Sequence, residues 1–396
     1  MTVRALLVLA IAICNQPAHA QSTGAVGEKI PPARGTFPLT KFYDTANPLP
    51  PGSPGDLIRS EDFDDYDLPL HIRAVRILYH SRSAARQDVA ASGVVLYPDA
   101  KPPAHGWPLI AWAHPFQGVA RQCAPSLARN LQHGPALSMY VNLGYAVVAT
   151  DYAGLGTSYR NAFLDAQSNA NDVIYSVPAA RAAMPLLGLR WVAIGLGQGG
   201  SAVIVVSESE NAIRDSNYLG SIAISGLSDF EDRYSPSPSP VFYDMPLFLA
   251  YGVKSDYPEF DPREVLTDKA RTLYPSVEQS CSEPTEVLRL SPSQLLKPNW
   301  ASNKFVRLYF ARSSLAKKPA HRPLLVISSE LDSTFPQTNQ VIAGMCKQRD
   351  VVQFEPYPQS DVSGIFGDSV EDQLAWLQAR FAGRPATSTC AENKPN

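Results

Sequence analysis

Charged residues are scarce in this sequence, and no cluster of basic residues is present. Asp, Glu, Lys and Arg make up only 18% of the 396 residues, and the net charge is −3 at pH 7. Proteins that bind nucleic acid or an anionic membrane surface use clustered Lys and Arg side chains. We therefore expect neither nucleic acid nor such a membrane surface as a partner.

Long apolar runs are absent after the first residues. Met1 and Arg4 precede an apolar run at 5–14, and a short polar stretch then ends in Ala-His-Ala at 18–20. This pattern is typical of a cleavable secretory signal, and the run is too short to anchor the chain in a bilayer. The sequence predicts a signal peptide at 1–20, no membrane anchor, and a secreted protein, either extracellular or periplasmic.

Cysteine is also rare. Cys14 lies in the expected signal peptide, which leaves Cys123, Cys281, Cys346 and Cys390. An even number of cysteines in an exported chain predicts two disulfides, and three pairings are open. None of the spacings matches a metal-binding or CxxC pattern, so we expect no metal site, and we expect no cofactor.

Short apolar, β-branched runs recur along the chain, and several lack the alternation of a half-exposed strand. Such runs are typical of strands covered on both faces, and helical patterns lie between them at 172–187, 200–209 and 369–381. We expect an α/β fold with a mostly parallel, doubly wound sheet. The expected strands are 74–79, 91–97, 108–113, 146–150, 191–195, 221–225 and 323–328.

The composition divides the rest of the chain into segments. Residues 21–55 are rich in Pro, Gly and Ser and predict an extended arm, whereas 229–321 lack strong strands and predict an insertion over the carboxyl edge of the sheet. A long structural loop is the alternative for this insertion. The expected segments are therefore the arm at 21–55, core at 56–228, the insertion at 229–321, core at 322–385 and a tail at 386–396.

The segment 191–200 reads WVAIGLGQGG and leads directly into a helical pattern. A strand, a glycine-rich turn and a helix are the context of the nucleophile elbow, G-x-S-x-G. Gly197 takes the position of the nucleophile, in a strained turn, and Gly195 and Gly199 would let the strand and the helix approach closely. Gly195, Gly197 and Gly200 also match the dinucleotide pattern G-x-G-x-x-G, which belongs to a first strand–helix unit and needs an acidic residue after the next strand. The next strand runs instead into Gly-Leu-Ser at 226–228.

Further motifs lie on both sides of this turn. They are FY at 42–43, PG at 54–55, IR at 58–59, AWAH at 111–114, CAPS at 123–126, GYAVVATDY at 144–152, GLG at 154–156, LD at 331–332, YP at 357–358 and DVSG at 361–364. Together with the elbow they resemble the secretory lipase family, the lipase-A type known from yeasts and many bacteria. The resemblance covers most of the mature chain. It implies an α/β-hydrolase fold with a helical cap at 229–321 over an acyl-binding cleft, and the disulfides Cys123–Cys281 and Cys346–Cys390.

The sequence departs from that family where the chemistry occurs. The family has GHSQGG where this chain has GLGQGG, so its nucleophilic serine falls on Gly197. Its triad acid is retained as Asp332, and its histidine falls on Val362. Its oxyanion loop, of HGTTG type in bacterial members, reads HPFQG at 114–118, and the proline lacks an N–H. The resemblance places His114, Gln117 and Gln198 around the oxyanion hole.

The histidine is missing on any alignment. The triad of α/β-hydrolases runs Ser, then Asp or Glu, then His along the chain. The sequence has seven histidines, and the last, His321, precedes Asp332. No histidine can therefore take the proton from a nucleophile, which is the step that the triad requires.

We accordingly expect an inactive lipase or esterase homologue that binds an acyl chain or another apolar small molecule. The alternative is an active carboxylic-ester hydrolase or lyase that uses His114, Asp332 and Asp361 in the same cleft, with Ser201 as a further candidate nucleophile. A protein-binding role for its surface is the third hypothesis. Once a nucleophile is no longer needed at position 197, glycine is favoured there because it relieves the strain of the elbow.

Overall fold

The computed structural model describes residues 35–225, 245–281 and 290–390. The expected signal peptide, the first part of the arm, the Gly-Leu-Ser segment at 226–228, the start of the insertion and the end of the tail lie outside these residues. Among the helices described, none is long and apolar enough to cross a membrane.

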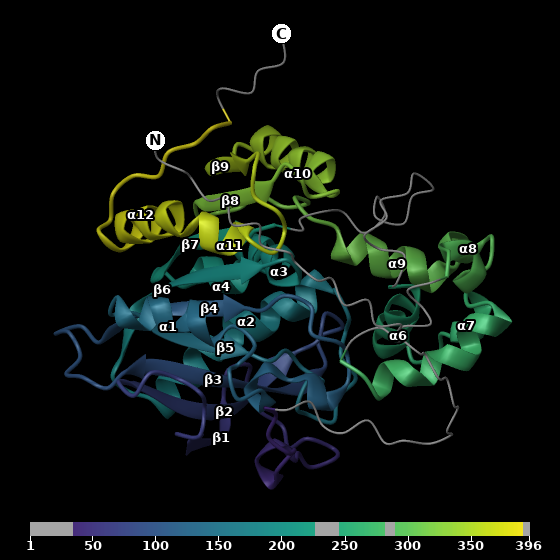
Figure 1. Ribbon diagram of the computed structural model, residues 1–396, viewed down its shortest axis with the longest axis horizontal. Coiled ribbons are helices and arrows are strands. Elements are labelled where there is room, and N and C mark those ends of the chain that lie inside the picture. The colour runs from purple at the N-terminus through teal and green to yellow at the C-terminus, as the bar shows by residue number, and fades with distance from the viewer. Residues whose placement is uncertain (1–34, 226–244, 282–289, 391–396) are drawn as a thin grey trace, which may run out of the picture. The chain divides into compact units, whose positions relative to one another are not determined.

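A nine-stranded sheet forms the core of the protein (Figure 1). Its strand order is β1-β2-β3-β5-β4-β6-β7-β8-β9. The pairs β1–β2, β2–β3 and β3–β5 are antiparallel, and all later pairs are parallel. The strands are β1 Leu57–Asp62, β2 Ile72–Arg82, β3 Asp88–Pro98, β4 Trp107–Ala113, β5 Ala146–Thr150, β6 Leu187–Leu196, β7 Tyr218–Ile224, β8 Leu324–Ser329 and β9 Val352–Tyr357.

Helices connect the parallel strands and cover both faces of the sheet. The α-helices are α1 Gly134–Asn142, α2 Ala166–Ala183, α3 Gln198–Glu208, α4 Glu210–Arg214, α6 Pro246–Asp256, α7 Asp268–Leu273, α8 Pro292–Leu295, α9 Lys304–Ser313, α10 Phe335–Lys347, α11 Ile365–Asp368 and α12 Val370–Phe381. The 3₁₀ turns are η1 Lys41–Tyr43, η2 Arg121–Cys123, η3 Pro125–Leu127, η5 Pro262–Glu264, η6 Tyr274–Glu278 and η8 Trp300–Ser302.

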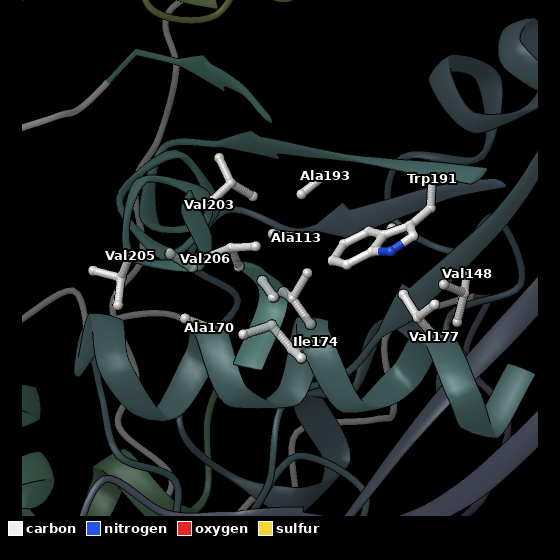
Figure 2. Packing of buried hydrophobic residues seen from close by; sticks show 14 of the residues in the cluster. Ala113, Val148, Ala170, Ile174, Val177, Trp191, Ala193, Val203, Val205 and Val206 are labelled. Carbon is white, nitrogen blue, oxygen red and sulfur yellow. The ribbon is translucent and has the colours of Figure 1, made fainter. Parts of the chain in front are cut away.

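Alternate side chains of β4 enter two different cores, which explains why this strand is apolar throughout. Leu109 and Ala111 belong to the core shared with α2, α3 and α10. Ile110 and Trp112 belong to the core shared with α1 and α12. Figure 2 shows the first core, where side chains of α2 and α3 meet those of β4 and β6. Helices on both faces and a mostly parallel sheet confirm the expected α/β fold.

The residues between β7 and β8 contain α6 to α9 and pack into a core of their own. This core holds buried residues of these helices, together with Val119, Phe163 and Leu164 from the sheet domain. The disulfide Cys123–Cys281 joins η2 to the residues after η6. The second disulfide, Cys346–Cys390, joins α10 to the C-terminal segment. Both pairings agree with those that the resemblance implies.

The expected elements differ from the observed ones in two respects. The expectation omitted β1 and β9, the two edge strands of the sheet. The helix expected at 172–187 begins instead at Ala166 and ends at Ala183, and Leu187 opens β6. The early start has a physical reason, because the Asp165 side chain accepts a hydrogen bond from the Ser168 N–H and caps the first turn.

Candidate functional site

The turn between β6 and α3 has the backbone of a nucleophile elbow. Gly197 has φ of 58° and ψ of −115° and lies between the last residue of β6 and the first of α3. Its N–H donates to the Ile224 carbonyl of β7 at 2.8 Å. This conformation is strained for a residue that carries a Cβ. The turn has the backbone that the sequence predicts for an elbow, and Gly197 adopts it without the strain that a Cβ would bring.

The two flanking glycines are needed for packing, as predicted. A Cβ at Gly195 would lie 2.0 Å from the Gly199 carbonyl oxygen, and one at Gly199 would lie 1.9 Å from the Ala113 oxygen. Neither position can hold a larger residue without moving the backbone. Gly197 differs, because a Cβ there would meet its nearest atom, Pro115 Cβ, at 3.4 Å. The turn therefore has room for a Cβ at position 197.

The loop after β4 faces this turn. Pro115 is the residue nearest to a side chain at position 197, and it has no N–H to offer an oxyanion. The next residue, Phe116, packs against Phe163 and Phe248, with ring centroids 5.1 and 5.0 Å away. Gln117 is half-buried in the same loop. The loop thus supplies an apolar contact to α6 where the resemblance predicts polar donors.

His114 is buried beneath this loop, with only 1% of its surface exposed. Its Nδ1 lies 2.6 Å from the Pro115 carbonyl oxygen, and its Nε2 lies 3.1 Å from that of Asp151. Its ring stacks on Tyr152, 4.2 Å between centroids. Burial lowers the pKa of His114 to about 4, against the opposing effect of the two carbonyls. Such a ring is neutral near pH 7 and has both nitrogens against backbone, which suits a structural role.

Asp332 lies just past β8 and is 5% exposed. Its Oδ2 accepts a hydrogen bond from the Ser225 Oγ at 3.0 Å, and its Oδ1 accepts from the Thr334 N–H at 2.8 Å. Ser225 follows β7 directly and has φ of 54°, an unusual value for serine. No sequence pattern predicts this contact, since a hydroxyl 107 residues away belongs to no local motif.

Asp361 and Val362 lie in the loop between β9 and α11. The Asp361 Oδ1 accepts hydrogen bonds from the Ser363 N–H at 2.9 Å and the Gly364 N–H at 2.7 Å. It also accepts from the Ser363 hydroxyl, and these bonds lower the pKa of this exposed carboxyl. Val362 is 50% exposed. Asp361 therefore shapes the loop, and Val362 presents an apolar side chain at the position where the resemblance predicts a histidine.

The remaining candidates lie on α3. Gln198 is the first residue of this helix and is buried. Ser201 lies in the first turn, where its N–H donates to the Gly197 carbonyl at 3.2 Å. Across residues 35–225, 245–281 and 290–390, no three His, Cys, Asp or Glu side chains group as a metal site requires.

No protein-family model and no curated protein matches the sequence. Solved structures do match the fold. The closed state of Candida antarctica lipase A matches with a TM-score of 0.73 and 15% identity, over 88% of this chain and 87% of that one. The rice cell wall degrading esterase LipA of Xanthomonas oryzae matches with a TM-score of 0.68 and 19% identity, over 84% of this chain and 99% of that one.

The chain has a lipase-A-like α/β-hydrolase fold. At 15% and 19% identity, the similarity to these structures shows the fold alone. Within the lipase-A-like fold, Gly197 occupies the turn where α/β-hydrolases carry their nucleophile, at the end of the strand before α3. Asp332, the candidate for the triad acid, lies in the loop that follows β8.

Proposed function

We propose that this protein is a secreted, lipase-like homologue that does not catalyse serine-dependent hydrolysis and binds an apolar ligand instead. The supporting observation is the elbow itself. Its backbone is retained in the strained conformation, with room for a Cβ, yet Gly197 carries no hydroxyl. Val362 stands half-exposed where a histidine would be needed.

The chemistry explains why these two positions matter. A serine attacks an ester carbonyl only after a histidine removes its proton, and the acid holds that histidine in place. Here Asp332 is retained but hydrogen-bonds Ser225 and the backbone of Thr334. Losing Ser or His from such a triad lowers kcat by roughly 10⁶-fold. With both positions lost, we expect no ordinary esterase activity.

Apolar contacts around the elbow support a ligand of the acyl type. Phe116, Phe163 and Phe248 bring three rings from the loop after β4, the segment before α2, and α6. Phe163 and Phe248 are fully buried, so an apolar ligand would meet this aromatic cluster at the partly exposed ring of Phe116. Secretion is supported by the two disulfides, which persist in oxidising compartments.

Hydrolysis of p-nitrophenyl esters of short and long acyl chains tests the proposal. We expect the purified mature protein to be inactive and the Gly197→Ser, Val362→His double variant to gain activity, with a preference for long chains. The matched control is Gly197→Ala, Val362→His, which has the histidine without a nucleophile.

Three outcomes would count against the proposal. Turnover by the unmodified protein would place the chemistry in other residues. A folded but inactive double variant would show that more than the triad has been lost. A gain confined to short chains would exclude an acyl-binding cleft.

A further inference from the structure

Three charged side chains meet where the insertion packs on the sheet domain. Asp165 precedes α2 of the sheet domain, whereas Asp256 ends α6 and Arg312 lies on α9 of the insertion. The Arg312 Nε donates to the Asp165 Oδ2 at 2.8 Å. The Arg312 Nη2 lies 2.8 Å from the same oxygen and also donates to the Asp256 Oδ2. One guanidinium thus connects two carboxylates from the two sides of this contact.

The two carboxylates are fully buried. Their side chains are 0% exposed, against 22% for Arg312. The Asp165 Oδ1 accepts from the Ser168 N–H at 2.7 Å. The buried Asp256 Oδ1 has no hydrogen-bond donor among the residues that the structure describes. If both carboxylates were ionised, two negative charges would face the single positive charge of Arg312. The unpaired negative charge would cost free energy because it is buried. Burial and the neighbouring Asp165 raise the pKa of Asp256 to about 8.

Other titratable groups surround the three residues. The guanidinium of Arg312 lies 5.5 Å from the ring centre of Tyr257 and 6.0 Å from that of Tyr309. Burial raises the pKa of Tyr159, which faces Asp256 from the sheet domain, to about 12. Burial also raises the pKa of Tyr257, so Tyr159 and Tyr257 ionise above the range in which Asp256 titrates.

Two further acids and two lysines complete the surroundings. Asp172 on α2 interacts with Asp165, and burial raises the pKa of Asp172 to about 7. A cavity of about 220 Å³ beside Arg312 is lined by Glu208, Lys317 and Lys318. Burial raises the pKa of Glu208 to about 7. The cavity gives water a route to Arg312. Asp172 and Glu208 titrate in nearly the same pH range as Asp256, so substitutions are needed to tell the effects of the three acids apart.

We propose that Asp165, Asp256 and Arg312 form a pH-dependent latch between the insertion and the sheet domain. The latch is closed while Asp256 holds a proton, so that one negative charge faces Arg312, and it loosens when that proton leaves. The same helix α6 carries Phe248, which packs on Phe116 beside the elbow. This inference does not depend on the proposed function.

The size of the effect follows from proton linkage. In the open state Asp256 is exposed to water and has an ordinary pKa, near 3.8, whereas in the closed state its pKa is about 8. Between these values the closed state holds one more proton. The opening constant should therefore rise about tenfold per pH unit and become constant above about pH 8.

Hydrogen exchange followed by mass spectrometry measures this opening in the full mature protein. Exchange rates of α6 and α9 amides, divided by their intrinsic rates, should rise about tenfold per unit between about pH 5 and 8. In Asp256→Asn this slope should disappear, because the asparagine does not titrate. The matched control is Asp268→Asn, which removes an 89% exposed carboxylate of α7 and should leave the slope unchanged.

Asp165→Asn is a second, independent variant. Asparagine can still cap α2. Without the Asp165 charge the pKa of Asp256 should fall, although burial still raises it, so the pH range over which exchange rises should become narrower. A flat profile in the unmodified protein would overturn the proposal. So would an unchanged pH profile in a folded Asp256→Asn or Asp165→Asn variant, since Glu208 or Asp172 would then carry the effect.

Discussion

At the scale of single residues, the glycines of the elbow have different roles. Gly195 and Gly199 leave no room for a Cβ, because carbonyl oxygens lie within 2.0 Å of where it would be. Gly197 has that room and is distinguished by its φ of 58°. Gly195 and Gly199 therefore allow β6, α3 and β4 to pack closely, whereas position 197 can accept another residue at a cost in backbone strain.

Substitution of these glycines by alanine should separate packing from strain. We expect Gly197→Ala to lower the free energy of unfolding by about 1–3 kcal/mol, the usual cost of a strained backbone conformation. Gly195→Ala should cost more or prevent folding, because its Cβ meets a backbone carbonyl. Urea denaturation followed by tryptophan fluorescence measures both. Equal losses in the two variants would contradict this assignment.

The roles of Asp332 and Val362 rest on the resemblance and remain predictions. The turn at Gly197 could be predicted from the sequence, because a strand, a glycine-rich stretch and a helix adjoin there. The hydrogen bond from Ser225 to Asp332 could not, because it depends on how β7 and β8 pair. The same holds for Asp256 and Arg312, whose partner Asp165 is distant in sequence.

At the scale of elements, prediction succeeded for strands with two buried faces. The seven central strands have apolar runs that require burial, and all seven are present. The edge strands β1 and β9 were missed for a common reason. Each is partly exposed and carries charged residues such as Glu61 and Glu355, so its sequence resembles a loop. The strand order was beyond prediction, because it depends on contacts between distant segments.

The buried side chain of Arg76 connects the N-terminal segment to this sheet. The Arg76 side chain on β2 is 1% exposed, and its guanidinium lies 3.2 Å from the ring centre of Phe63. It also donates to the Tyr66 hydroxyl at 2.9 Å and to the Ser126 carbonyl at 3.2 Å. Rings of Phe37 and two tyrosines complete the enclosure. This one side chain therefore contacts three separate segments of the chain, at residues 37–43, 63–66 and 126.

Replacing Arg76 by methionine should therefore destabilise the protein. We expect a loss of about 2–3 kcal/mol in the free energy of unfolding, from the lost charged hydrogen bonds and ring contacts. Arg73→Met on the same strand is the control, since Arg73 is exposed and its ion pairs with Asp64 and Asp99 lie in solvent. Guanidinium denaturation compares the two. A loss no larger than that of Arg73→Met would count against the role of Arg76.

At the scale of the whole molecule, buried acids set the pH dependence of stability. Burial raises the pKa of Asp172 and Glu208 to about 7 and that of Asp256 to about 8. The folded state therefore binds protons that the unfolded state has lost, and stability falls as pH rises. His114 acts in the opposite direction, because burial lowers its pKa to about 4, but this effect ends above its unfolded pKa of about 6.5.

The free energy of unfolding should thus decrease between about pH 6.5 and 8, by roughly 1–2 kcal/mol per pH unit. Urea titrations at several pH values measure this slope. Asp172→Asn should reduce it, since one of the three acids no longer titrates. A stability that rises through this window would show that these carboxyls are ionised in the folded protein near pH 6.5.

The two disulfides have a consequence for proteolysis. A single cut between Cys123 and Cys281, or between Cys346 and Cys390, leaves both fragments covalently joined. A cut before Cys123, between Cys281 and Cys346, or after Cys390 gives two pieces that no disulfide joins. When the cut lies between Cys281 and Leu324, the pairing of β7 with β8 is one of the non-covalent contacts between the pieces. A non-reducing gel after limited digestion therefore indicates which part of the chain a protease has reached.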